Sequence, residues 1–389
     1  MSNSFRTVQH ILEASRRGDS LYSIYQGLEQ SEALLKERQK NAFELLFEIL
    51  IPSLTEELSQ ELATFPTEFL EIYATNISSS IAQALSLFNG KKLFLNKVQQ
   101  IDEGIAKVLS QWKGSSLHLN GLQQIDEKIA SALSHFHGSI FLDGVKQIDE
   151  KTAKKLVLFD REFYSNELEQ IHKTLIRSAS TASQAQSKGK SNVPSLQKLE
   201  KLAGTIINSI ERLQLHNLSL ETLVVRELRI VLSLNSLEQI DEATAKALAK
   251  FKGDQLYLNG VKQLDESTAI MLAQFKGYQL SLNGIEEIDK IVTIALAQFK
   301  GRRLSLEGIK QIDEVTAKAL AQFKGWSLDL NGIKQIDESV AKALAQWKGI
   351  ILSLNGIQKL DEVSAKALAQ YKGKIYAIEQ ILDQINKFK

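Results

Sequence analysis

The sequence predicts an open α/β solenoid, with short parallel strands along its concave side and helices along its convex side. Two observations predict this fold class: a unit of 24 residues recurs along the chain, and each unit holds one strand pattern and one helix pattern. Within the unit, a Leu-x-Leu segment comes first, an Asp-Glu pair follows, and an Ala-rich segment closes it. In the later run of units, the Asp keeps this step at Asp241, Asp265, Asp289, Asp313, Asp337 and Asp361.

The repeats divide the chain into five parts. We expect an N-terminal helical cap, a first repeat block, a helical insertion, a second repeat block and a C-terminal cap, over residues 1–76, 77–160, 161–229, 230–374 and 375–389. Residues 77–90 match only the helical half of a unit and would start the first block. The insertion contains an expected flexible loop at 178–195, which is nearly devoid of apolar residues. Three roles fit the insertion: a hinge, a cover for the repeats, or a partner site.

The unit at 328–349 shows how these residues would form a strand and a capped helix. Leu328 and Leu330 alternate with a polar residue, so both would lie on the buried face of a short strand. Asp337 stands where a helix begins, and its carboxylate can accept hydrogen bonds from the free amides of the first turn. Glu338 follows in that first turn, where the helix dipole favours a negative charge.

The second half of the same unit is predicted to be an amphipathic helix. Ala341, Leu344 and Trp347 recur at helical spacing and would form its buried stripe. Gly349 is expected to end the helix in the left-handed conformation. Each unit therefore needs a neighbour on both sides, because one strand and one short helix bury too little apolar surface to fold alone. Since strands stack more closely than helices do, the strands must lie on the inner side of an arc.

The units resemble leucine-rich repeats with helical convex faces. They are most similar to the ribonuclease-inhibitor-like class and to bacterial GALA-type repeats, through the pattern LxLNGI…IDExxAxALA. In that class an Asn usually comes three residues after the second strand Leu, whereas here Asn331 follows Leu330 directly and Ile333 takes the inward position. GALA-type proteins carry an F-box near the N-terminus, and residues 50–58 are the nearest, poor match to that motif.

Charge balance and cysteine content narrow the classes of function. Lys and Arg number 47 against 46 Asp and Glu, and this net charge of +1 argues against nucleic acid as the partner. The absence of cysteine excludes disulfides, thiolate catalysis and cysteine-ligated zinc. The start lacks the apolar core of a signal peptide, and residues 42–51 are too short to span a bilayer, so we expect no membrane partner. These features favour a soluble, cytoplasmic protein, with secretion as a bacterial effector without a cleaved signal peptide left open. The resemblance to GALA-type repeats implies a bacterial source.

The Asp-Glu pairs are the most obvious carboxylates for acid–base chemistry, but their repetition argues against catalysis. A catalytic pair converges once in a pocket, whereas these pairs recur at the start of every helix. His135 and His137 lie two residues apart without an evident third metal ligand, and we interpret them as a solvated helix end. The sequence therefore predicts no enzyme activity, no metal and no cofactor.

The strand positions that differ between units form the candidate binding site. Side chains before and between the two Leu of each strand are expected to point to the concave face. The candidate protein-binding residues at these positions are Lys92, Phe94, His118, Phe141, Gln255, Tyr257, Gln279, Arg303, Asp329 and Ile351. Among them, Tyr257, Arg303 and Asp329 are expected as isolated anchors of the kind that form interface hot spots.

Phe94, His118 and Phe141 occupy the same position in three successive units of the first block. We expect them to stack as an exposed aromatic row, which is unusual in a monomeric protein unless something covers it. The cover is either a partner protein or the insertion of this same chain, and the sequence does not decide between the two.

A column of Asn residues follows the second strand Leu of the units. Stacked amides can hydrogen-bond to one another along a sheet edge, so a structural ladder is favoured over a ligand site. Asp143 and Glu307 are expected to interrupt the column, because a carboxylate cannot donate a hydrogen bond. The Asn members are Asn96, Asn120, Asn235, Asn259, Asn283, Asn331 and Asn355.

Together these features predict a non-enzymatic leucine-rich-repeat scaffold that binds another protein through its concave face. The alternative is a bacterial effector or ubiquitin-ligase-adaptor-like protein, in which the N-terminal helices recruit a partner and the repeats select the target. The sequence gives neither the identity of the partner nor the oligomeric state.

Overall fold

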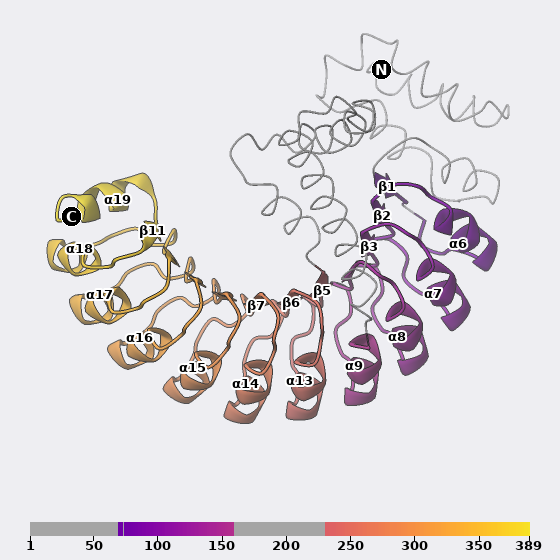
Figure 1. The fold of residues 1–389 in the computed structure, drawn as a ribbon, viewed down its shortest axis with the longest axis horizontal. Helices are drawn as coiled ribbons and strands as arrows, with labels where there is room; N and C mark the ends of the chain where they lie inside the picture. The colour runs from indigo at the N-terminus through magenta and orange to yellow at the C-terminus, as the bar shows by residue number, and fades with distance from the viewer. Residues whose placement is uncertain (1–68, 73, 159–229) are drawn as a thin grey trace, which may run out of the picture. The chain divides into compact units, whose positions relative to one another are not determined.

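The computed structural model describes residues 69–72, 74–158 and 230–389. In this part of the chain, eleven strands form one sheet, each parallel to its neighbours, and their order follows the sequence. Helices alternate with the strands and lie on the outer side of the stack (Figure 1). The predicted α/β solenoid of leucine-rich repeats is confirmed. The expected helical cap up to residue 68 and the expected insertion, with its loop at 178–195, lie outside the described residues.

The strands are three residues long: β1 (Phe69–Glu71), β2 (Lys92–Phe94), β3 (Ser116–His118), β4 (Ser139–Phe141), β5 (Val231–Ser233), β6 (Gln255–Tyr257), β7 (Gln279–Ser281), β8 (Arg303–Ser305), β9 (Ser327–Asp329), β10 (Ile351–Ser353) and β11 (Lys374–Tyr376). The helices are α6 (Ser79–Ser86), α7 (Glu103–Leu109), α8 (Glu127–Leu133), α9 (Glu150–Leu156), α13 (Glu242–Leu248), α14 (Glu266–Leu272), α15 (Lys290–Leu296), α16 (Glu314–Leu320), α17 (Glu338–Ala345), α18 (Glu362–Leu368) and α19 (Glu379–Asn386). Because β1 pairs with β2, the array begins before the boundary expected at residue 77.

Equivalent residues of successive repeats lie side by side in the sheet. Leu304 of β8 pairs with Leu328 of β9, and Leu328 pairs in turn with Leu352 of β10. All three side chains are fully buried. A constant repeat length therefore converts one residue of the sequence pattern into a column across the structure.

The sheet is continuous at the point where the insertion leaves the array. Ile140 of β4 pairs with Leu232 of β5, and the next residues pair likewise. The Ser139 hydroxyl oxygen also accepts a hydrogen bond of 3.1 Å from the backbone N–H of Val231. The role of the insertion stays a prediction, because residues 159–229 lie outside the described residues.

The Asp of each pair caps its helix, as the sequence predicted. In α17, the Oδ1 of Asp337 accepts a hydrogen bond of 2.8 Å from the backbone N–H of Val340, and Glu338 pairs with Lys342 on the same helix. Hydrogen bonds from the third helical residue hold the pKa of the cap carboxyl below its ordinary value in Asp149, Asp241, Asp265, Asp313, Asp337 and Asp361. These carboxylates therefore act as helix N-caps, because they accept hydrogen bonds from backbone amides of the first helical turn.

Gly349 does not adopt the left-handed conformation that the sequence predicted. Helix α17 ends at Ala345, and its C-cap Gln346 keeps right-handed helical angles. A Cβ atom at Gly349 would lie 2.1 Å from the Cζ2 of Trp347. Glycine recurs at this position because the aromatic ring two residues earlier leaves no room for a side chain.

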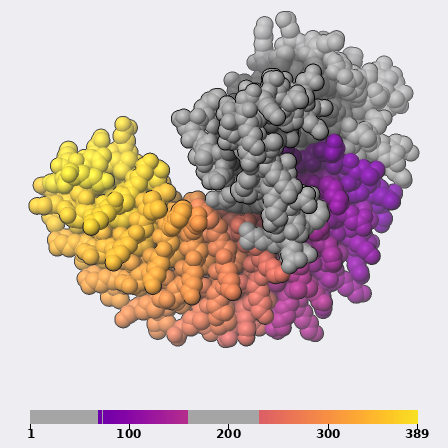
Figure 2. Space-filling view, in the orientation of Figure 1, coloured from indigo at the N-terminus to yellow at the C-terminus, as the bar shows by residue number. Residues whose placement is uncertain are grey.

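A spine of aromatic rings runs through the buried layer between the sheet and the helices. In the second block, Phe251, Phe275, Phe299, Phe323, Trp347 and Tyr371 stack in order, with ring centroids 6.0–6.2 Å apart. The indole N–H of Trp347 donates to the carbonyl of Phe323 at 2.6 Å, so its polar atom is satisfied despite burial. Figure 2 shows the second block as one continuous packed surface from its orange part to the yellow C-terminal end.

Candidate functional site on the concave strand surface

The ten candidate residues all lie on the three-residue strands of the sheet. They come from β2 (Lys92, Phe94), β3 (His118), β4 (Phe141), β6 (Gln255, Tyr257), β7 (Gln279), β8 (Arg303), β9 (Asp329) and β10 (Ile351). The Leu or Ile at the centre of each of these strands is buried, so the flanking positions project to the opposite, concave side. The structure groups the candidates into an aromatic cluster around His118, a polar cluster around Tyr257 and a polar cluster formed by Arg303 and Asp329. Ile351 pairs in register with Ser327, which belongs to the same strand as Asp329.

The aromatic row forms as predicted. The ring of His118 stacks on Phe94 at a centroid distance of 4.2 Å and on Phe141 at 4.1 Å, and all three residues are partly exposed. Burial, together with the positive charge of Lys92, lowers the pKa of His118 to about 4. The imidazole is therefore neutral at pH 7, and its Nε2 lies 2.7 Å from the hydroxyl of Ser116. The result is a rigid row of three flat rings with one lysine at its edge.

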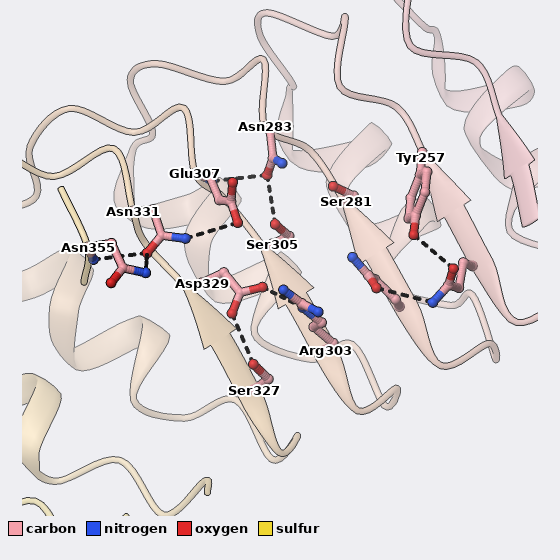
Figure 3. A network of polar contacts seen from close by, with 12 residues as sticks. Tyr257, Ser281, Asn283, Arg303, Ser305, Glu307, Ser327, Asp329, Asn331 and Asn355 are labelled. Atoms are coloured by element: carbon pink, nitrogen blue, oxygen red, sulfur yellow. Dashed lines mark hydrogen bonds and ion pairs between the residues drawn. The ribbon is translucent and has the colours of Figure 1, made fainter. Parts of the chain in front are cut away.

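A polar cluster lies on β6 and β7. The phenol of Tyr257 donates a hydrogen bond of 2.8 Å to the side-chain oxygen of Gln255, whose amide nitrogen lies 3.4 Å from the oxygen of Gln279 (Figure 3). Tyr257 is partly exposed and held in place by Gln255. It remains a candidate anchor, although it is not isolated.

Arg303 and Asp329 are not the isolated anchors that the sequence predicted. The Nε of Arg303 lies 2.5 Å from the Oδ2 of Asp329, and the hydroxyl of Ser327 donates to the Oδ1 of the same carboxylate at 3.0 Å (Figure 3). Asp329 is only 1% exposed, whereas the Arg303 side chain is 42% exposed. Asp329 therefore positions the guanidinium of Arg303, which is the member of the pair that a partner can reach.

The Asn column is a ladder in which most links join a side-chain oxygen to a backbone N–H of the next repeat. Asn331 and Asn355 are also joined amide to amide, because the Nδ2 of Asn355 donates to the Oδ1 of Asn331 at 3.1 Å. The Oδ1 of Asn283 accepts hydrogen bonds from the hydroxyl of Ser305 at 2.8 Å and from the backbone N–H of Glu307 at 3.0 Å. The same oxygen-to-backbone link joins Asn120 to Asp143, Asn235 to Asn259, Asn259 to Asn283 and Asn331 to Asn355. Each of these links therefore requires a side-chain oxygen that accepts a hydrogen bond from the next repeat.

The expected interruption of the column at Asp143 is wrong for this reason. The Oδ1 of Asp143 accepts from the backbone N–H of Asn235 at 3.1 Å, as an Asn would. Glu307 keeps a contact as well, because its Oε1 accepts from the side-chain amide of Asn331 at 3.1 Å (Figure 3). The ladder is structural, since it joins successive repeats from Asn120 to Asn355. The Oδ1 of Asn96 is buried without such a partner among the described residues.

Two exposed aromatic residues on the terminal strands were missed by the sequence reading. Phe69 of β1 is 36% exposed and pairs in register with Lys92, and Tyr376 of β11 is 40% exposed. The ammonium group of Lys374 lies 4.5 Å from the ring centroid of Tyr376. Tyr376 follows the central Ile375 of its strand just as Ser353 follows Leu352, and this alignment is the signal that identifies it.

The described residues contain no group of three His, Asp or Glu side chains placed to hold a metal ion. The Nδ1 of His135 lies 2.9 Å from the carbonyl oxygen of Ser131 at an exposed helix end, as expected for this residue. Among the same residues, no helix has both the length and the apolar content to cross a membrane.

No family model matches the chain, and no curated protein matches it. Among solved structures, an internalin from Listeria monocytogenes is similar, with a TM-score of 0.35 and 15% sequence identity. The match covers 86% of this chain and 88% of the internalin chain. The assignment to the leucine-rich-repeat fold rests on the repeated strands and helices of the chain itself.

Proposed function

We propose that this chain is a leucine-rich-repeat scaffold that binds another protein through its concave strand surface. This proposal is supported by the strand positions that vary between repeats, because they flank the buried Leu or Ile at the centre of each strand and lie on the opposite face. The likeness of the repeat pattern to the ribonuclease-inhibitor-like class and to GALA-type repeats is part of the same proposal.

The observation that carries the proposal is the stacked row of Phe94, His118 and Phe141. Aromatic side chains that are already fixed by stacking lose little conformational freedom on binding, and such residues dominate protein interfaces. The neutral imidazole lets the row bind an apolar surface without first losing a charge. Tyr257 and the held guanidinium of Arg303 add directional contacts on the later strands.

The proposed role is non-enzymatic. The repeated carboxylates, which are the most abundant acid–base candidates, accept hydrogen bonds from helix amides. Their lowered pKa values keep them ionised at neutral pH, as a helix cap requires.

Quantitative affinity capture with a concave variant tests the proposal. The variant combines Phe94→Ala, Phe141→Ala and Tyr257→Ala. Arg303 is left unchanged, because its removal would leave the buried carboxylate of Asp329 without its ion-pair partner. We expect proteins held by the unmodified chain to be lost, while far-UV circular dichroism stays unchanged.

The matched control truncates exposed apolar residues of the convex helices, with Ile291→Ala, Val315→Ala and Val363→Ala. Partners should be held by this control as they are by the unmodified chain. Equal retention by the concave variant would assign the binding to another surface.

The adaptor alternative depends on the N-terminal helices expected over residues 1–76, of which residues 1–68 lie outside the described residues. It stays a prediction, and so do the bacterial origin and the cytoplasmic location. Capture of a ubiquitin-ligase component by the full chain, and its loss on deletion of residues 1–68, would favour the adaptor.

A further inference from the structure

From residue 273 onward, one edge of the second repeat block carries positive charge without any acidic residue. This edge, which we call the basic rim, consists of the segments that join α14, α15, α16, α17 and α18 to the next strand, at 273–278, 297–302, 321–326, 346–350 and 369–373. The segment before them, which joins α13 to β6, contains Asp254 and is not part of the rim. None of the rim segments contains Asp or Glu, and each has an exposed lysine, at Lys276, Lys300, Lys324, Lys348 and Lys372. The Asp-Glu helix starts lie at the opposite edge, where the strands end.

The lysines of the basic rim differ from those on the helices. Lys318 and Lys342 pair with Glu314 and Glu338 one turn earlier on their own helices. The rim lysines form no ion pair with any described residue. Their positive potential is therefore directed to solvent, where it can attract an anionic surface.

Exposed aromatic and aliphatic residues lie between these lysines in one continuous row. The backbone N–H of Arg302 donates to the carbonyl of Tyr278 at 2.8 Å, Trp326 donates to Arg302 at 2.7 Å, and Ile350 donates to Trp326 at 2.9 Å. These hydrogen bonds place the four residues on consecutive rungs. Trp326 is 47% exposed and Ile350 is 53% exposed.

Arg302 holds the indole of Trp326 in a defined position. Its guanidinium carbon lies 3.9 Å from the centroid of the Trp326 ring and 5.9 Å from that of Tyr278. Arg302 is exposed, so the edge of its guanidinium still faces solvent and can bind a phosphate group. The basic rim thus combines lysines, an arginine, an ordered indole and an aliphatic side chain.

We propose that the basic rim binds the surface of an anionic lipid bilayer, with Trp326 and Ile350 entering the interfacial layer. This peripheral contact departs from the sequence-based expectation of no membrane partner, which rested on the lack of a signal peptide and of a spanning segment. Lysine and arginine near such a surface are attracted to its anionic headgroups, and Trp is favoured at the boundary between headgroups and acyl chains. A continuous anionic surface repels every acidic residue that approaches it, which accounts for the complete lack of Asp and Glu in the rim segments.

A bilayer fits these residues better than the other polyanions do. Ile350 offers nothing to the bases of a nucleic acid, and Arg302 already covers one face of the Trp326 indole on which a base would stack. An acidic protein presents discrete charges and would tolerate scattered acidic residues between the lysines. The proposal is independent of the concave surface, because the rim lies at the starting edge of the strands.

Tryptophan fluorescence of the full chain reports on the rim directly. Of the 3 tryptophans in the chain, Trp112 is 1% exposed and Trp347 is 2% exposed, so changes in solvent contact come from Trp326. Vesicles of phosphatidylcholine with phosphatidylserine should shift the emission to shorter wavelength and protect it from iodide. Acyl-brominated lipid in these vesicles should quench it, and pure phosphatidylcholine should do neither. Unchanged emission with the anionic vesicles would overturn the proposal.

Vesicle co-sedimentation of matched variants tests the charges. The rim variant combines Lys300→Gln, Lys324→Gln and Lys348→Gln, and we expect its partition coefficient to fall about 100-fold. The control combines Lys310→Gln, Lys334→Gln and Lys359→Gln, which are exposed lysines on the opposite edge of the same repeats, and should bind as the unmodified chain does. Equal binding by both variants would overturn the proposal. The proposal would also be overturned if the unmodified chain did not bind the vesicles but bound polyglutamate or oligothymidylate, and the rim variant lost that binding.

Discussion

The Oδ1 of Asp143 accepts a hydrogen bond of 3.1 Å from the backbone N–H of Asn235, a residue 92 positions later in the chain. The same oxygen accepts from the hydroxyl of Ser233 at 2.5 Å, and the carbonyl of Asp143 accepts from Ser236. These contacts join β4 to β5 across the interruption of the repeats. Polar side chains thus reinforce the backbone pairing where the repeat pattern is broken.

Asp143→Ala should lower the free energy of unfolding by about 1–3 kcal/mol, because it removes the acceptor shared by two donors at the junction. Asp143→Asn keeps an Oδ1 acceptor and restores the residue found at the same position in neighbouring repeats, so it should cost little. Chemical denaturation of the two variants measures the difference. Equal losses would mean that the carboxylate charge, and not the acceptor, holds the junction.

Asp313→Ala should lower the free energy of unfolding only modestly, since it removes the oxygen that accepts from the Thr316 amide at 2.7 Å. Leu320→Ala should cost about 2–5 kcal/mol, because that side chain is fully buried. Urea unfolding monitored by circular dichroism compares the two on one scale. Comparable losses would contradict the division of the repeat into cap and core.

The lowered pKa of His118 predicts a pH dependence of stability. As the pH falls below the unfolded-state pKa of about 6.5, the unfolded chain binds a proton that the folded chain does not bind until about pH 4. Stability from this group is therefore present above about pH 6.5 and lost as the pH falls toward about 4. His118→Phe keeps a ring between Phe94 and Phe141 and should flatten this part of a plot of melting temperature against pH. An unchanged slope would show that His118 titrates normally.

Two glycine substitutions should have opposite effects. A Cβ at Gly332 would lie 2.2 Å from the backbone oxygen of Glu307, so Gly332→Ala should destabilise by about 1–3 kcal/mol. Gly104 lies in α7 at a position where the other repeats carry a side chain, so Gly104→Ala should stabilise by up to about 1 kcal/mol. Thermal unfolding distinguishes these outcomes. A neutral Gly332→Ala would show that the turns have room to separate.

The strand columns could be predicted because they depend on repeat length alone. Once Leu304, Leu328 and Leu352 recur at one step, parallel in-register pairing follows. The role of Gly349 could not be predicted in the same way, because it depends on how far the ring of Trp347 extends over the backbone. The spacing of residues in the sequence predicts which residues are neighbours in the structure, but it does not predict the distances between their atoms.

The candidate site was predicted at the level of positions and less well at the level of contacts. Phe94, His118 and Phe141 share one position, so their stacking follows from the period. Arg303 and Asp329 occupy different positions on adjacent strands, and their pairing runs diagonally across the sheet. Opposite charges at diagonal positions of neighbouring repeats are a signal that a two-dimensional alignment of the units would have shown.

The pairing of β4 with β5 also determines what the chain can carry. The chain departs after α9, at Leu158, and returns at Ile230, directly before β5. The equivalent positions of the next repeat, Lys250 and Asp254, are joined by only three residues, so the two points lie at most about 15 Å apart. A segment whose ends meet so closely can be lengthened, shortened or exchanged without changing the register around it. The junction between α9 and β5 is therefore a site where another domain could be inserted while the repeats keep their fold.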